Sequence, residues 1–171
     1  MDLPNIETKK YSADILTEDY YLQCTIEPLG VLMTYLDTPD RKNILVKNVT
    51  MKGLASNSAV GSVNIKELWI TRDEILTIRV DEEAVKGSIQ NLPAKENLRI
   101  FLPRFVVQGT LTHGEDARVD DMFEVLKGSW AAASNAQVFP LISMKTQVFR
   151  QAPLLLINKN RIRFYEPIQT P

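Results

Sequence analysis

The chain has 171 residues, of which 44% are hydrophobic, and its 20 basic and 21 acidic side chains leave a formal net charge of -1. This length can bury a core without metal or disulfide staples, and the charge balance excludes a general electrostatic attraction to nucleic acid or to an anionic membrane. The single cysteine, Cys24, excludes an intramolecular disulfide and a multi-cysteine zinc site. No signal-peptide core is seen near Met1, and the longest aliphatic run, Leu154 to Ile157, is too short for a bilayer, so we expect a cytoplasmic protein without membrane contact.

Residues 1–17 lack apolar periodicity, which predicts an N-terminal arm. Residues 20–27 then alternate with period two, which predicts a strand whose inner face includes Cys24. A short helix is expected around Leu32 to Leu36, and Thr38-Pro39-Asp40 would end it.

The rest of the first half has a β pattern, in residues 43–51, 63–70 and 75–80. The alternation is interrupted at Lys47-Asn48, which predicts a β-bulge. Four polar residues, 71–74, separate the last two strands and predict a hairpin-like turn.

The second half resembles the first. Asn48 to Arg79 aligns without a gap with Asn135 to Glu166 at an offset of 87 residues, with a shared pattern of apolar positions. A second helix is predicted over 119–126, and the charged segment between the halves predicts a linker with one helical turn at 82–86.

These patterns predict a mainly β (α+β) protein of two tandem β-α-β-β-β copies, which form a pseudo-twofold pair of small curved sheets or barrels. The expected divisions are an arm at 1–17, a first copy at 18–81, a linker at 82–97, a second copy at 98–166 and a C-terminal tail at 167–171.

One candidate ligand-binding group lies where the second helix begins. His113, the only histidine, precedes Gly114-Glu115-Asp116, and an imidazole beside two acids can hold a metal or act as a base. The alternative is a turn at Gly114 whose acid caps the helix. Arg118 and Asp121 stand three residues apart and predict an ion pair on that helix. We take His113, Arg118 and Asp121 as the candidate group and expect no metal and no cofactor.

An enzyme would require a different pair, Cys24 with His113. The period of its strand places Cys24 on the inner face, which favours an inert thiol over a nucleophile. Glycine-rich phosphate-binding motifs and a Gly-x-Ser-x-Gly elbow are missing from the sequence.

A candidate nucleic-acid site lies near the end of the chain. Lys159, Arg161 and Arg163 alternate beside Tyr165, and such a strand can stack on and neutralise a single strand. Acidic residues at the corresponding turn, 73–74, and the net charge near zero make nucleic acid a partner that is not favoured.

The segment Gln108 to His113, followed by Arg118, Asp121 and Phe123, resembles a pattern in small uncharacterised bacterial β-rich domains, together with the turn Asn158 to Ile162. The resemblance implies a small β domain and no catalytic residues.

We therefore expect a non-catalytic binding or assembly module, which forms homo-oligomers through exposed sheet edges or the N-terminal arm. Two alternatives stay open: a small-barrel protein that binds single-stranded nucleic acid, and an enzyme with a site at Cys24 and His113. The sequence identifies no small-molecule ligand.

Overall fold

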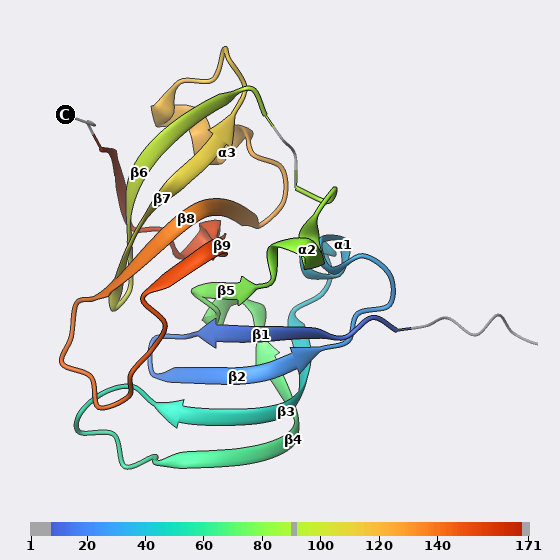
Figure 1. Cartoon of the computed structure of the whole chain (residues 1–171), viewed down its shortest axis with the longest axis vertical. Helices are drawn as coiled ribbons and strands as arrows, with labels where there is room; N and C mark the ends of the chain where they lie inside the picture. The colour runs from blue at the N-terminus through green and yellow to red at the C-terminus, as the bar shows by residue number, and fades with distance from the viewer. Residues whose placement is uncertain (1–7, 90–91, 169–171) are drawn as a thin grey trace, which may run out of the picture.

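The computed structural model describes residues 8–89 and 92–168. The chain is mainly β, as expected, and the strands of these residues form one open antiparallel sheet (Figure 1). None of the described helices is long and apolar enough to cross a membrane.

The first half contains β1 (Tyr11–Leu16), β2 (Tyr20–Ile26), α1 (Leu32–Asp37), β3 (Asn43–Gly53), β4 (Ser62–Thr71), the 3₁₀ turn η1 (Arg72–Glu74) and β5 (Thr77–Val80). A one-turn helix, α2 (Glu82–Val85), follows. The second half contains β6 (Ala94–Leu102), β7 (Phe105–His113), η2 (Val119–Asp121), α3 (Met122–Val125), β8 (Trp130–Pro140), β9 (Gln151–Asn158), η3 (Lys159–Arg161) and β10 (Phe164–Pro167).

The strand order in the sheet is β10-β6-β7-β8-β9-β5-β1-β2-β3-β4. Within each half, the last strand in sequence lies beside the first, and β9 of the second half pairs with β5 of the first. We call the β5–β9 pairing the seam. It joins the upper strands of Figure 1 to the lower ones.

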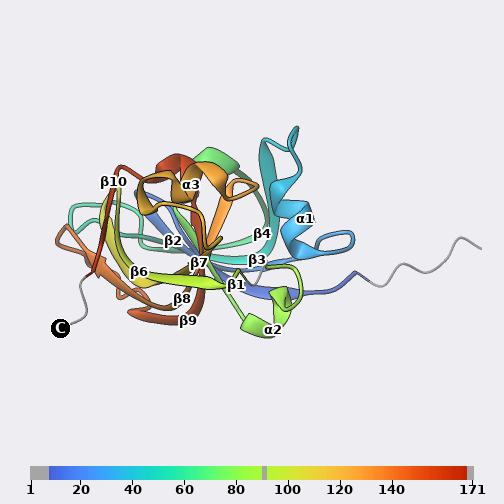
Figure 2. The ribbon, with the colours of Figure 1, turned by 90° about the horizontal axis from the view of Figure 1, so that it is seen from above.

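The structure does not show the expected pseudo-twofold pair of small curved sheets or barrels, because the described strands of both halves form one sheet. A twofold axis would place like strands next to each other, for example β5 beside β10, whereas the seam joins β5 to β9 in head-to-tail order. The edges of the sheet are β4, at the foot of Figure 1, and β10, at the left of Figure 2.

Two local expectations also differ from the structure. Residues 11–16 form β1, between β2 and β5, rather than part of an arm. Residues 71–74 do not close a hairpin, because η1 redirects the chain away from β4 and β5 pairs with β1 and β9 instead. Alternation identifies a strand but not its neighbour, so the sequence carried no signal for either pairing.

The expected helix at α1, the turn at α2 and the bulge near Asn48 are confirmed. The helix expected over 119–126 is present as the 3₁₀ turn η2 followed by the short helix α3. Leu32 and Leu36 of α1 lie four residues apart and are fully buried, so the helix packs by one narrow face. At Asn48, φ is 49°, where the register of β2 against β3 shifts.

The core consists of two apolar clusters, one mainly in each half. The first-half cluster also contains Trp130, Leu154 and Leu156, and the second-half cluster contains Leu16 and Leu76. Each half therefore completes the core of the other, which a short curved sheet could not bury alone.

Candidate functional site

The seam is a buried contact between the halves. Leu155, Leu156 and Ile157 of β9 lie opposite Arg79, Ile78 and Thr77, and all three β9 side chains are fully buried. The pairing continues beyond β5, where the Asn158 amide donates to the Leu76 carbonyl at 3.0 Å.

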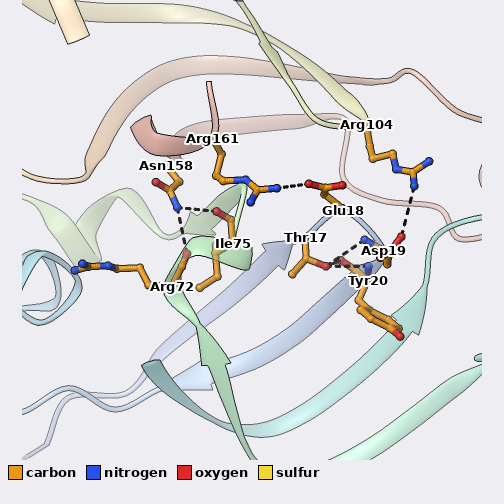
Figure 3. A network of polar contacts seen from close by, with 9 residues as sticks. All are labelled: Thr17, Glu18, Asp19, Tyr20, Arg72, Ile75, Arg104, Asn158 and Arg161. Carbon is orange, nitrogen blue, oxygen red and sulfur yellow. Dashed lines mark hydrogen bonds and ion pairs between the residues drawn. The ribbon is translucent and has the colours of Figure 1, made fainter. Parts of the chain in front are cut away.

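The side chain of Asn158 links η1 of the first half to the second half (Figure 3). Its Nδ2 donates to the Ile75 carbonyl at 2.9 Å and to the Arg72 carbonyl at 3.1 Å, and its Oδ1 accepts from the Asn160 amide at 3.1 Å. The side chain is fully buried. A satisfied buried amide holds two segments in one geometry, so Asn158 specifies how the halves meet.

Charged side chains add to the seam on the side shown in Figure 3. Arg161 forms an ion pair with Glu18, and Arg104 lies 3.7 Å from Asp19 in the same turn between β1 and β2. Arg161, a predicted nucleic-acid contact, is thus paired with an acidic residue of the other half.

The halves also meet beside α1. Asp37 Oδ1 accepts from the Ser129 amide at 2.7 Å, and Trp130 Nε1 donates to the Leu36 carbonyl at 3.3 Å. Burial raises the pKa of the Asp37 carboxyl, and the Ser129 hydrogen bond and the nearby Lys159 charge partly offset this.

Lys159 does not point to solvent. Its Nζ donates to the Phe123 carbonyl at 3.2 Å and to the Leu126 carbonyl, both at the end of α3. Burial lowers the pKa of the Lys159 ammonium, and Asp37 opposes the shift. A cation on the last carbonyls of a helix is a C-terminal cap, and Arg163 is the one exposed member of the predicted basic group.

The predicted ligand-binding group is spread over one strand end and one exposed turn. His113 is buried at the end of β7, and its Nδ1 lies 2.7 Å from the Gly114 carbonyl, to which it donates. Arg118 pairs with Asp120 at 3.1 Å, so the expected pair with Asp121 is wrong. The backbone amide of Asp121 instead donates to the Arg118 carbonyl, which closes η2.

Cys24 is 8% exposed, and burial raises the pKa of its thiol to about 12. Four strands separate β2 from β7 in the sheet, so Cys24 and His113 lie on distant strands. Among the described residues, no group of three or more histidine, cysteine or acidic side chains is arranged to hold a metal ion.

Two neighbouring open cavities, of about 360 and 510 Å³, lie beside α2 and share Ile89, Thr112 and Ala132 in their walls. Glu82 and Glu83 line one of them and Asp37 lines the other. Asp37 already accepts the hydrogen bond from Ser129 that joins the halves. That contact explains why Asp37 lies beside the cavity.

The sequence pattern predicts nucleic-acid contacts at Lys159 and Arg161, whereas the structure shows contacts of Lys159 with the end of α3 and of Arg161 with Glu18. The pattern assigned no role to Asn158, whose buried side chain links the two halves. The available signal was a polar residue, Asn158, that ends a run of four aliphatic residues. Comparison of the chain with protein-family models, with curated proteins and with solved structures gave no significant match.

Proposed function

We propose that the chain is a non-catalytic assembly module built from two copies of one unit, and that each unit binds its neighbour edge to edge. The observation that carries the proposal is the seam, in which a strand of one half completes the sheet and the core of the other. Edge addition of a strand is a general mode of protein recognition, because main-chain hydrogen bonds supply affinity and side chains supply specificity.

The caps of α1 and α3 support the duplication. Arg72 follows β4 and donates from Nη1 to the Leu36 carbonyl at 3.4 Å and from Nη2 to the Pro39 carbonyl at 3.4 Å. Lys159 follows β9, and its two acceptors, Phe123 and Leu126, lie 87 residues after Leu36 and Pro39. The same basic position thus contacts two corresponding carbonyls in both halves, and Arg72 makes a further, shorter bond to the Thr38 carbonyl at 3.0 Å.

A cross-strand ion pair is also repeated, with its charges exchanged. Arg79 of β5 pairs with Asp14 of β1 at 2.6 Å, and Glu166 of β10 pairs with Arg99 of β6 at 2.6 Å. Both pairs are directly opposite in register. Exchanging the two charges of a pair keeps their attraction, although the sign of the charge at each position changes. Such an exchange is expected when two copies of one unit diverge in sequence and keep the same fold.

We find no arrangement of catalytic side chains among the described residues. The Cys24 thiol is neutral at physiological pH, since its pKa is raised to about 12, and a neutral thiol is a poor nucleophile. A lone buried thiol also agrees with a reducing compartment, and we place the protein in the cytoplasm.

The test is a chain with a protease site inserted between Ser88 and Ile89, in the segment that joins the halves. After cleavage, the halves are expected to stay together as a one-to-one complex in native mass spectrometry, because the seam and the shared cores remain. Asn158→Ala should weaken this complex about tenfold or more, since it removes the side-chain donor to the buried Ile75 carbonyl and one of the two donors to the Arg72 carbonyl.

Asn160→Ala is the matched control, because the Asn160 side chain is exposed and its backbone amide makes the contact to Asn158. Halves that separate or unfold on cleavage of the unsubstituted chain would refute the proposal.

A further inference from the structure

The strands at the two edges of the sheet correspond in position to the two strands that pair at the seam. β4 occupies in the first half the place of β9 in the second, and β10 occupies the place of β5. We propose that β4 of one chain pairs with β10 of a second copy, so that copies join head to tail and repeat the seam between molecules. This inference rests on the proposed function, because it takes the two halves as copies of one unit.

If each edge strand lacks the partner that its counterpart has at the seam, its side chains should be exposed where those at the seam are buried. Leu156 at the seam is fully buried, whereas Trp69, 87 residues earlier on β4, is 64% exposed. Thr77 at the seam is likewise fully buried, whereas Phe164, 87 residues later on β10, is 68% exposed. Large apolar side chains on two open edges, at positions that are covered at the seam, mark a contact surface.

The seam also defines the register between copies. Ile157, Leu156 and Leu155 lie opposite Thr77, Ile78 and Arg79. The same alignment, moved by 87 residues on each strand, places Ile70, Trp69 and Leu68 of one copy opposite Phe164, Tyr165 and Glu166 of the next.

Backbone amides of both edges face the right way for this register. The Arg72 amide donates to Lys42 of β3 at 2.7 Å, and amides alternate between the two sides of a strand, so Trp69, three residues earlier, turns its amide to the open edge. The Ile168 amide donates to Asn97 of β6 at 2.7 Å, so Tyr165, three residues earlier, also turns outward. Trp69 and Tyr165 are the residues that the register pairs.

Charges at the ends of the proposed contact are complementary. The seam joins Asp37 to Ser129, and the corresponding residues at the edges are Glu124 and Lys42, both exposed. The seam also joins Arg161 to the turn between β1 and β2, and the corresponding groups are Glu74 and the turn that carries Arg104, whose side chain also lies 3.7 Å from Asp19 of its own chain. Each pair brings opposite charges together, which favours this partner and this orientation.

Such a contact is heterologous, since different surfaces of the two copies meet. It cannot stop at a symmetric dimer, because every added copy presents a new free edge until a ring closes. The proposed assembly is thus a ring or an open chain, with seams inside molecules and β4–β10 pairs between them.

The experiment compares Trp69→Lys, which disables β4, with Phe164→Lys, which disables β10, by light scattering after size exclusion over a wide concentration range. The unsubstituted protein is expected to assemble beyond a dimer. Each variant alone should associate about 30-fold more weakly, the effect typical of a central interface residue. An equimolar mixture should form one-to-one heterodimers, because one intact β4 and one intact β10 remain.

Leu29→Lys is the control, since Leu29 is 74% exposed and belongs to neither edge strand but to the loop between β2 and α1, and it should leave the mass unchanged. Lys42→Glu tests the same contact without touching either edge strand: it should weaken assembly, and adding Glu124→Lys should restore it. Thermal unfolding checks that each variant folds.

A strictly monomeric unsubstituted protein, or a symmetric dimer that survives in one of the lysine variants, would overturn the inference. Cleaved halves that stay together while the intact chain is monomeric would show that only the pairing between copies fails and that the proposed unit-to-unit binding stands.

Discussion

Asn48 and Asn135, 87 residues apart in the sequence, share a left-handed backbone conformation, with φ of 49° and 50°. Each lies where a long strand changes register against its neighbour, β3 against β2 and β8 against β7. A left-handed residue in a strand produces a bulge and bends the sheet, so the two residues curve both halves in the same manner.

The two asparagines should respond alike to substitution. Asn→Gly at either position should leave the free energy of unfolding nearly unchanged, whereas Asn→Val should lower it by about 1–2 kcal/mol, because a β-branched side chain opposes positive φ. Denaturant unfolding measures both. A large loss at one position with none at the other would contradict a common role.

Lys159 should be replaceable by arginine but not by an apolar residue. Lys159→Met leaves the carbonyls at the end of α3 without their donor and should cost about 1–3 kcal/mol of stability. Lys159→Arg should recover most of that loss, as Arg72 does this work in the first half. Chemical denaturation provides the comparison, and equal losses in both variants would argue against a cap.

The two cross-strand ion pairs, Arg79–Asp14 and Arg99–Glu166, should contribute differently to the free energy of unfolding. Arg79 makes two hydrogen bonds to Asp14 and stacks over the Phe149 ring at 4.4 Å, whereas the Arg99–Glu166 pair is more exposed. Arg79→Met should therefore lower the free energy of unfolding by about 1–2 kcal/mol and Arg99→Met by less than about 0.5 kcal/mol. Similar losses, measured at low and high salt, would show that burial does not separate the pairs.

Asp37 should make the protein less stable as pH rises. Its folded pKa is raised by burial, so the folded state binds the proton more tightly than the unfolded state. This favourable contribution is complete below the unfolded pKa of about 3.9 and is lost as pH rises through the raised folded value. Asp37→Asn, whose carbonyl still accepts from Ser129, should remove this slope from the stability–pH curve. A wild-type slope retained in the variant would assign it to another group.

Cys24 should not react with thiol reagents in the folded protein. Because the thiol is buried and its pKa is about 12, labelling of the native protein at mildly alkaline pH should occur only at the rate of unfolding, and denaturant should reveal one thiol per chain. Rapid labelling of the native protein would reopen Cys24 as a reactive site.

Sequence patterns located most elements of the fold but few of its contacts. Period two identified β2 and β3, the buried leucines of α1 repeat at helical spacing, and the irregularity at Asn48 marked a bulge. These signals succeed because they depend on residues close together in the chain. The hairpin expected at 71–74 was wrong, since the partner of a strand is chosen by surfaces far away in sequence.

The candidate site shows the same division. Lys159 and Arg161 are conspicuous in the sequence because they are charged, yet their partners, Phe123 and Glu18, belong to distant segments. Charge alone cannot distinguish a helix cap or an ion pair at a junction from a nucleic-acid contact, because desolvation and geometry decide which of them forms.

By itself, the sequence determined that this chain is mainly β and that its halves resemble each other over Asn48 to Arg79 and Asn135 to Glu166. Only the tertiary structure decided that β9 joins β5, and that β4 and β10 remain at the edges. The reason is physical: local periodicity dictates which face of a strand is apolar, whereas the choice of neighbour depends on which arrangement buries those faces together and satisfies polar groups such as Asn158.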